Sequence, residues 1–216
     1  MAAAEQSFLD ELAETVGKDP IAFRLELLDK AIASPVGKQN DYDAKRYVEV
    51  LKLVREKSGW GKNQSNISRG ISVYYCHNTY SAQVLDLTLE KGKLIIPRVC
   101  CVIDCGIVVN PDAATNLAEG AIIDGIGNVL FGSMTFKDGV AEKTNFHNYR
   151  MIRGSEAPKN IDVHFVQNDF DPTGMGEPAF PPIFAALANA LYKATGKRFY
   201  DQPFGTSLNA FSRTGM

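Results

Sequence analysis

Residues 70–103 read GISVYYCHNTYSAQVLDLTLEKGKLIIPRVCCVI and contain three apolar runs. The first run alternates in character along the chain, with apolar side chains at Ile71, Val73 and Tyr75. A period of two is typical of a β-strand, because successive side chains point to opposite faces of a sheet. Two short polar segments, residues 78–79 and 91–93, separate the runs. The stretch therefore predicts an antiparallel meander of three strands.

The 62 residues at the N-terminus predict helices instead. Apolar residues at helical spacing indicate a first amphipathic helix, and these are Phe8, Leu9, Leu12 and Val16. Asp19 directly before Pro20 indicates the start of a second helix. Asp41 or Asp43 could cap a third helix, which ends at Gly59. The residues on its apolar face are Tyr47, Val50, Leu51 and Val54.

A long helix and a strand are predicted downstream of the meander. Asn110 followed by Pro111 indicates a helix start, and the helix extends to about residue 130. Three glycines lie in its interior, at Gly120, Gly125 and Gly127. Each costs about 1 kcal/mol relative to alanine, so we expect another backbone or a ligand to approach closely. A strand at 161–166 and a helix at 182–195 complete an α+β arrangement.

Composition excludes several classes of function. The 216 residues can bury roughly 70% of their unfolded surface. A formal net charge of −2 indicates no surface for a nucleic-acid backbone or an anionic membrane. The longest apolar stretch, residues 179–192, is too short to span a bilayer, and the N-terminus lacks a signal pattern. We therefore expect a soluble chain without an export signal, and its compartment stays open.

The cysteines predict neither disulfides nor a zinc site. The four are Cys76, Cys100, Cys101 and Cys105. Strand alternation would place Cys100 on the opposite face from Cys101 and Cys105, and no second pair or histidine completes a set of four ligands. We expect buried thiols and no metal ligand in this chain.

The segment Gly174-Met175-Gly176-Glu177-Pro178 is the leading candidate for chemistry. Gly174 and Gly176 can take positive φ and let the main chain lie against a bulky ligand, while Pro178 favours an extended Glu177. A helix start directly afterwards favours an ionised carboxylate, which a general base requires. The alternative is a glutamate that only complements the helix dipole or lies in solvent. Likewise, the helix at 110–127 could contact a cofactor or simply pack tightly, and His147 could line a substrate channel or an ordinary loop.

Several motifs in a fixed order resemble the large subunits of the xanthine oxidase family of molybdenum hydroxylases. The resemblance is greatest to the isoquinoline 1-oxidoreductase and aldehyde oxidoreductase type. The motifs occupy residues 7–13, 17–20, 23–24, 58–61, 102–106, 109–111, 119–121, 145–149 and 174–178. The resemblance implies a helical linking segment at 1–62 and, at 63–216, the C-terminal part of a molybdopterin-binding domain with a mixed, largely antiparallel sheet.

The resemblance also implies a reaction. Glu177 matches the glutamate that takes a proton from a molybdenum-bound hydroxyl, so that the oxygen attacks an electron-poor carbon of an N-heterocycle or aldehyde. A hydride passes to the sulfido ligand, and electrons leave through iron–sulfur clusters of a partner. The cofactor is molybdenum–molybdopterin, in its cytosine dinucleotide form. The residues expected to contact it are Gly174, Gly176, Asn116, Glu119 and Gly120.

Two features depart from the family pattern. Family members usually carry a glutamine that contacts the pterin two residues before the Glu119-Gly120 pair, where this chain has Leu117, although Asn116 could partly substitute. Family large subunits also carry several hundred residues ahead of this region. We therefore expect a fragment that binds no cofactor and is inactive alone, with the upstream part of the large subunit and an iron–sulfur small subunit as partners. The alternative is a degenerate scaffold or assembly module.

Overall fold

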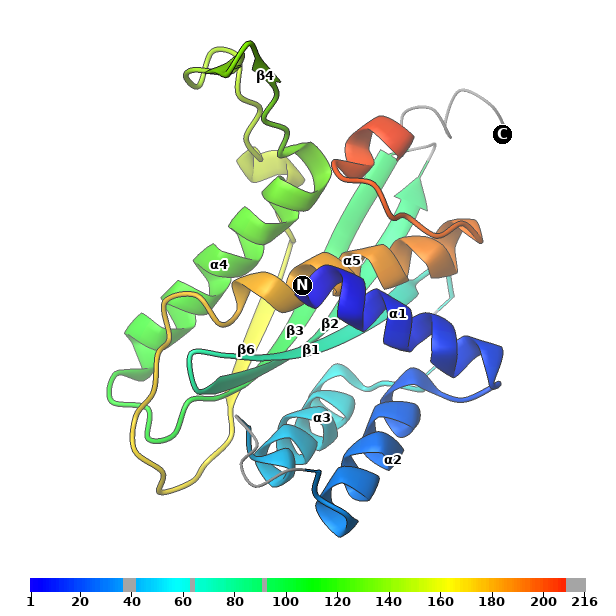
Figure 1. The fold of residues 1–216 in the computed structure, drawn as a ribbon, viewed down its shortest axis with the longest axis vertical. Coiled ribbons are helices and arrows are strands. Elements are labelled where there is room, and N and C mark those ends of the chain that lie inside the picture. The colour runs from blue at the N-terminus through cyan, green and yellow to red at the C-terminus, as the bar shows by residue number, and fades with distance from the viewer. Residues whose placement is uncertain (37–41, 63–64, 91–92, 209–216) are drawn as a thin grey trace.

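The predicted meander forms the centre of the computed structural model, which describes residues 1–36, 42–62, 65–90 and 93–208 (Figure 1). Three antiparallel strands, β1 (Ser68–Cys76), β2 (Thr79–Glu90) and β3 (Lys93–Asp104), follow one another. A fourth strand, β6 (Ile161–Phe165), pairs in parallel with β3, so the strand order is β1-β2-β3-β6. The α+β fold class with a mixed, largely antiparallel sheet is thus confirmed.

The two turns of the meander differ in outcome. The first turn was predicted at residues 78–79 but lies one residue earlier, at His77 and Asn78. Thr79 already belongs to β2, where it pairs with Cys76. At the second turn, Lys91 and Gly92 lie outside the described residues.

Five helices have both their ends within the described residues, and they pack around the sheet. They are α1 (Ala2–Thr15), α2 (Pro20–Ala33), α3 (Ala44–Ser58), α4 (Pro111–Phe131) and α5 (Phe180–Thr195). A short hairpin, β4 (Phe136–Lys137) and β5 (Val140–Ala141), and a 3-10 turn at Gly154–Glu156 lie between α4 and β6.

Helix ends follow the local signals in the sequence. The Asp19 carboxylate accepts hydrogen bonds from the N–H groups of Ile21 and Ala22, which confirms the predicted cap of α2. Asp43 caps α3, whereas Asp41 lies outside the described residues. Asn110 caps α4, and Gly59 ends α3 in the left-handed conformation, as predicted. Only α5 begins earlier than predicted, at Phe180, because prolines are tolerated in a first turn whose N–H groups lack helical partners.

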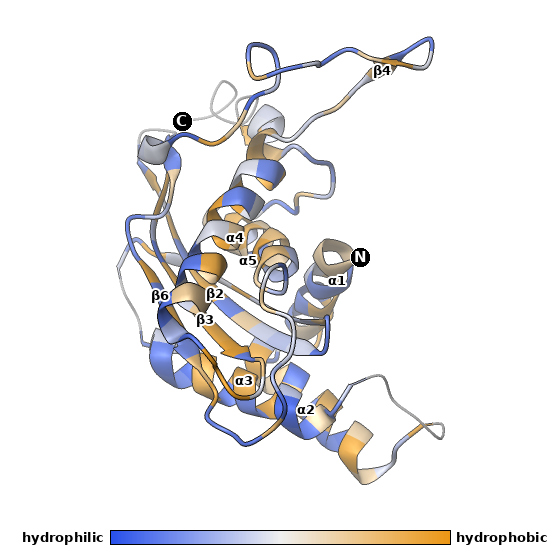
Figure 2. Cartoon of the chain, turned by 90° about the vertical axis from the view of Figure 1, so that its left-hand side faces the viewer, coloured by the Kyte–Doolittle hydropathy of each residue, from blue (hydrophilic) through white to orange (hydrophobic). Residues whose placement is uncertain are grey.

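Each face of the sheet has its own apolar core. α4 and α5 cover the face that carries Leu85, Cys101 and Ile103, whereas α2 and α3 cover the face that carries Val84 and Cys100 (Figure 2). The predicted separation of Cys100 from Cys101 is confirmed, and all four thiols are free. Burial raises the pKa of Cys101 to about 12, so this thiol is unreactive at neutral pH.

Neither a cluster of metal ligands nor a membrane-spanning helix is present among the described residues. Within the described ranges, no group of three or more His, Cys, Asp or Glu side chains could hold a metal ion. No helix of that part of the chain combines the length and the apolar character needed to cross a bilayer.

The interior glycines of α4 differ in their surroundings. A Cβ built on Gly125 would lie 2.3 Å from Cγ2 of Ile183 in α5, and one on Gly127 would lie 2.9 Å from Cβ of Ile152. Both glycines are closely approached, as predicted, but the nearest atoms are those of isoleucine side chains rather than of a backbone or a ligand. A Cβ on Gly120 would meet nothing within 4 Å. This glycine is open to solvent, so packing does not account for it.

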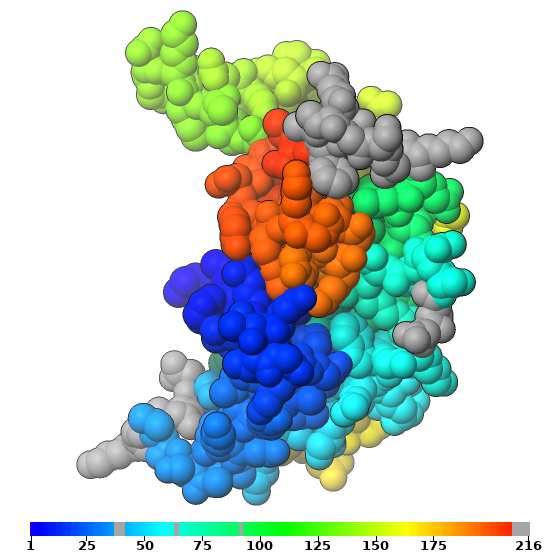
Figure 3. Space-filling model, turned by 90° about the vertical axis from the view of Figure 1, so that its right-hand side faces the viewer, coloured from blue at the N-terminus to red at the C-terminus, as the bar shows by residue number. Residues whose placement is uncertain are grey.

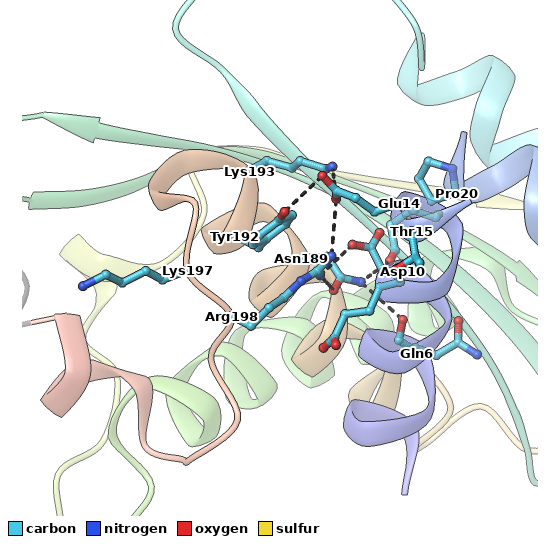
Figure 4. Close-up of polar contacts among 12 residues, drawn as sticks. Gln6, Asp10, Glu14, Thr15, Pro20, Asn189, Tyr192, Lys193, Lys197 and Arg198 are labelled. Atoms are coloured by element: carbon cyan, nitrogen blue, oxygen red, sulfur yellow. Dashed lines mark hydrogen bonds and ion pairs between the residues drawn. The ribbon is translucent and has the colours of Figure 1, made fainter. Parts of the chain in front are cut away.

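α1 packs with its polar face inward, against the expectation from its apolar spacing. The helix itself is confirmed, but Phe8 and Val16 are 58% and 55% exposed, while Gln6 and Asp10 are buried. α1 lies beside α5 (Figure 3), where polar partners replace an apolar core (Figure 4). There, Arg198 contacts Asp10 at 2.7 Å and Lys193 contacts Glu14 at 2.6 Å. From α2, Arg24 Nε donates to Gln6 Oε1 at 2.9 Å.

Candidate functional site

The topology brings four segments together at one end of the sheet. The turn between β1 and β2 lies there, and the register that pairs Tyr80 with Asp104 places the end of β3 beside it. Because β6 runs parallel to β3, its end at Phe165 lies at the same edge. The loop that follows β6 crosses this edge and carries the glycine-rich segment 174–178. Backbone hydrogen bonds tie the loop to the chain after β3, from Ile107 N–H to Phe170 C=O and from Thr173 N–H to Cys105 C=O, both 2.9 Å.

Glu177 lies immediately before α5 with its side chain 76% exposed. Its carbonyl accepts a hydrogen bond from Phe180 N–H at 2.9 Å, which closes a turn with Pro178 in the second position. The expected positive φ of Gly174 and Gly176 was wrong, since neither residue has it. Gly174 instead provides space, because a Cβ there would lie 3.2 Å from Cβ of His77, whereas one on Gly176 would meet nothing within 4 Å.

His77 is the partner of Glu177 that the sequence did not reveal. Its Nε2 lies 2.9 Å from Oε2 of Glu177, although the two residues are 100 positions apart. The signal was present but indirect: a two-residue gap between paired strands predicts a tight turn, and a histidine in that turn points away from the sheet. Only the strand register shows that this turn and the glycine-rich loop meet.

Asp104, at the end of β3, anchors the loop that follows β6. This carboxylate is 1% exposed and accepts hydrogen bonds from Arg46 Nε at 2.9 Å and Nη2 at 2.6 Å, and from Asn168 Nδ2 at 2.9 Å. Burial tends to raise the pKa of Asp104, but these donors and the Gly106 N–H outweigh burial and lower it. The Arg46 guanidinium lies over the rings of Tyr80 and Phe170, at 4.9 and 4.6 Å from their centroids. Arg46 thus holds α3, β3 and the loop together.

Replacing Arg46 with glutamine is expected to lower the free energy of unfolding by about 2–4 kcal/mol, because it leaves a buried carboxylate without its charged partner. A folded-state pKa below the unfolded value contributes stability above about pH 4, and this stability is lost as the pH falls through the folded value. The loss in the free energy of unfolding relative to wild type should therefore be largest at pH 7 and become smaller in acid. Urea unfolding at several pH values measures it. Arg55→Gln, on the exposed side of the same helix, is the control. Equal losses in both variants would contradict the anchoring role.

The other candidate residues lie on α4 rather than beside Glu177. Asn116, Glu119 and Gly120 are three and four residues apart and share one stripe of the helix. Asn116 and Gly120 are exposed, Glu119 is half-buried, and Leu117 beside them is 45% exposed. Within the described ranges, no hydrogen bond or ion pair joins this stripe to Glu177 or occupies its polar side chains. The open space at Gly120 and at Gly176, together with these unengaged polar groups, fits an external ligand rich in polar atoms.

His147 does not belong to this site. It lies in the exposed excursion between α4 and β6, which projects from one end of the molecule in Figure 3. The interpretation as an ordinary loop accounts for its position in this structure.

Comparisons with known proteins identify the family of the chain. Residues 22–158 match the family model described as the molybdopterin cofactor-binding domain. The chain is 29% identical over 218 residues to the beta chain of isoquinoline 1-oxidoreductase of Brevundimonas diminuta, covering 98% of this chain and 26% of that protein. It is 27% identical over 221 residues to one of the subunits of nicotinate dehydrogenase of Pseudomonas putida, covering 93% of this chain and 17% of that protein. The chain thus spans about a quarter or less of the length of these curated relatives.

A solved structure shares the fold at low sequence identity. The aldehyde oxidoreductase of Desulfovibrio gigas superposes with a TM-score of 0.67 at 12% identity, covering 96% of this chain and 40% of that one. This likeness shows the fold, whereas the match over residues 22–158 shows the family. The chain belongs to the molybdopterin cofactor-binding domain family of the xanthine oxidase-type molybdenum hydroxylases.

Proposed function

We propose that this chain supplies the general base and part of the cofactor-binding surface of an enzyme that hydroxylates an N-heterocycle or an aldehyde. A carbon–hydrogen bond of the substrate is replaced by a bond to oxygen from water, with release of two protons and two electrons. The observation that carries the proposal is the exposed Glu177 carboxylate, placed between open main chain at Gly176 and the N-terminus of α5.

Glu177 acts by accepting a proton from the oxygen nucleophile. The turn closed by Phe180 N–H fixes its backbone, and a carboxylate is a suitable group for accepting a proton. The loop has little freedom to move, because Asp104 and the hydrogen bonds after β3 hold it. A fixed base is an advantage, since orientation of reacting groups contributes much of an enzymatic rate enhancement.

The cofactor surface comprises the α4 stripe and the main chain of the glycine-rich loop. Asn116 and Glu119 offer hydrogen bonds, while Gly120 and the backbone at Gly174 and Gly176 allow close approach. When bound, the molybdenum–molybdopterin group, in its cytosine dinucleotide form, supplies the centre that receives the two electrons. An iron–sulfur partner subunit then takes the electrons onward.

The rest of a large subunit completes the site. Support comes from the relatives, which are named as parts of larger assemblies and of which this chain spans only 26% and 17%. Most of the surface around Glu177 is open in this chain, so water is not excluded from it. We infer that the chain by itself holds no molybdenum and shows no turnover.

The test combines metal analysis with turnover. The purified chain, alone and co-expressed with the remaining part of a large subunit and its iron–sulfur subunit, is assayed for molybdenum by mass spectrometry and for dye-linked oxidation of isoquinoline and aldehydes. We expect molybdenum and turnover only in the complete assembly. Stoichiometric molybdenum with turnover in the chain alone would contradict the inferred incompleteness.

One observation favours a second candidate, a scaffold or assembly module without catalysis. Leu117 lies on the cofactor stripe, 45% exposed, where the family pattern has a hydrogen-bonding glutamine. A complete assembly that is stable but free of molybdenum would support this alternative over the enzyme.

A further inference from the structure

His77 lies in the two-residue turn between β1 and β2. His77 and Asn78 both have positive φ, at 53° and 59°, as a two-residue turn between antiparallel strands requires. Apart from glycine, asparagine, aspartate and histidine are the residues enriched at positive φ, so both residues suit the turn. The turn fixes the backbone from which the imidazole of His77 extends toward Glu177.

Hydrogen bonds hold this turn firmly against the glycine-rich loop. Thr79, which is fully buried, donates its Oγ1 hydrogen to Gly174 C=O at 2.7 Å, and its Oγ1 lies 2.7 Å from Oγ1 of Thr173. Gly174 leaves just enough room for the histidine, as the 3.2 Å distance to a built Cβ indicates. The imidazole and the Glu177 carboxylate therefore meet across two segments that cannot easily separate.

The chemistry of the contact assigns donor and acceptor. Nε2 of His77 lies 2.9 Å from Oε2 of Glu177, and because an ionised carboxylate can only accept, a hydrogen bond between them requires the hydrogen on Nε2. The contact occupies one carboxylate oxygen and leaves Oε1 available. Both side chains are largely exposed in this chain, so water competes with the contact until a ligand and neighbouring segments cover it.

We propose that His77 is a positioning residue, whose Nε2–H holds one oxygen of Glu177 so that the other faces the reacting proton. The inference rests on the proposed role of Glu177 as the general base. His77 itself exchanges no proton with the substrate.

The contact is testable in the chain alone, because it contains only three histidines, His77, His147 and His164. Long-range proton–nitrogen correlation spectra of the ¹⁵N-labelled protein at pH 8.5, assigned with single histidine variants, report the tautomer of each ring. We expect His77 as the Nε2–H tautomer, and we expect Glu177→Ala to replace this signature with a mixture of tautomers. Glu142→Gln, an exposed glutamate elsewhere, should leave it unchanged. A His77 spectrum indifferent to Glu177→Ala would overturn the proposal.

The positioning role is tested in the complete enzyme. His77→Asn suits the positive φ of the turn but its shorter side chain does not reach Glu177, whereas His77→Gln keeps a donor of similar reach. We expect His77→Asn to lower kcat roughly tenfold or more with KM unchanged, and His77→Gln to recover most of the loss. Equal thermal melting of the two variants checks the turn. Wild-type kcat in His77→Asn would overturn the proposal.

These outcomes separate the two proposals. Turnover retained by Glu177→Gln would remove the general base, whatever the spectra of His77 show. A missing His77–Glu177 contact would remove the positioning residue and leave the base in place.

Discussion

Glu177→Gln is expected to abolish turnover of the complete enzyme, with kcat lowered by at least about a thousandfold, because an amide of the same shape cannot accept the proton that the proposed mechanism assigns to the carboxylate. The side chain is 76% exposed and makes no contact that the fold depends on. Molybdenum content and thermal stability are therefore expected to stay at wild-type values. The measurement is single-turnover reduction by substrate, which separates the chemical step from electron transfer.

Glu142→Gln is the matched control, since it removes the same charge from an exposed position in the β5 hairpin. It should retain wild-type kcat. If Glu177→Gln also keeps its turnover, Glu177 has no part in the mechanism. If it instead loses its molybdenum, the carboxylate has a structural role in holding the cofactor.

Gly70→Ala is expected to cost more than about 4 kcal/mol in the free energy of unfolding. A Cβ on Gly70 in β1 would lie 2.0 Å from Ala186 C=O and 2.4 Å from Ala190 N of α5. Both atoms belong to backbone, so no side chain can rotate away, and α5 must move off the sheet. A loss of this size takes much of the stability of an ordinary domain. Urea unfolding followed by circular dichroism measures it.

Gly120→Ala provides the control, because the same methyl group meets nothing within 4 Å there. Alanine in the interior of α4 should stabilise the chain by about 0.5–1 kcal/mol. The two substitutions are expected to change the free energy of unfolding in opposite directions. This difference separates the effect of a steric contact from the effect of helix propensity. Similar losses at both positions would mean that α5 does not lie on Gly70 as described.

Local signals in the sequence predicted most of the elements. Asp19, Asn110 and Gly196 mark helix ends through contacts within one turn, so the chain on either side suffices to interpret them. Strand periodicity likewise predicted the meander and the opposite faces of Cys100 and Cys101. The orientation of α1 could not be predicted this way. Its buried polar groups, which would otherwise be costly to bury, are satisfied by Arg24 on the next helix and by Arg198, which lies 188 residues from its partner Asp10.

The residues of the candidate site also differ in whether the sequence could predict them. Glu177 was predicted from its motif and from the resemblance to a family, whereas Asn116 and Glu119 were predicted from the resemblance alone. His77 and the Asp104–Arg46 pair were not found, because each depends on the register between strands that only the folded structure defines. The assignment of Gly174 and Gly176 to cofactor contact stays a prediction, although the conformation expected of them was wrong.

The polar attachment of α1 to α5 determines when this protein can finish folding. The partners in these contacts are between 178 and 188 residues apart, so α1 leaves the ribosome long before α5 exists. Bringing such distant segments together is slow, and the contacts stabilise α1 only after the sheet and α5 have formed. Until then, Asp10 and Glu14 lack these partners, although Gln6 can already bond to Arg24 of α2. We therefore expect α1 to dock on α5 late in folding.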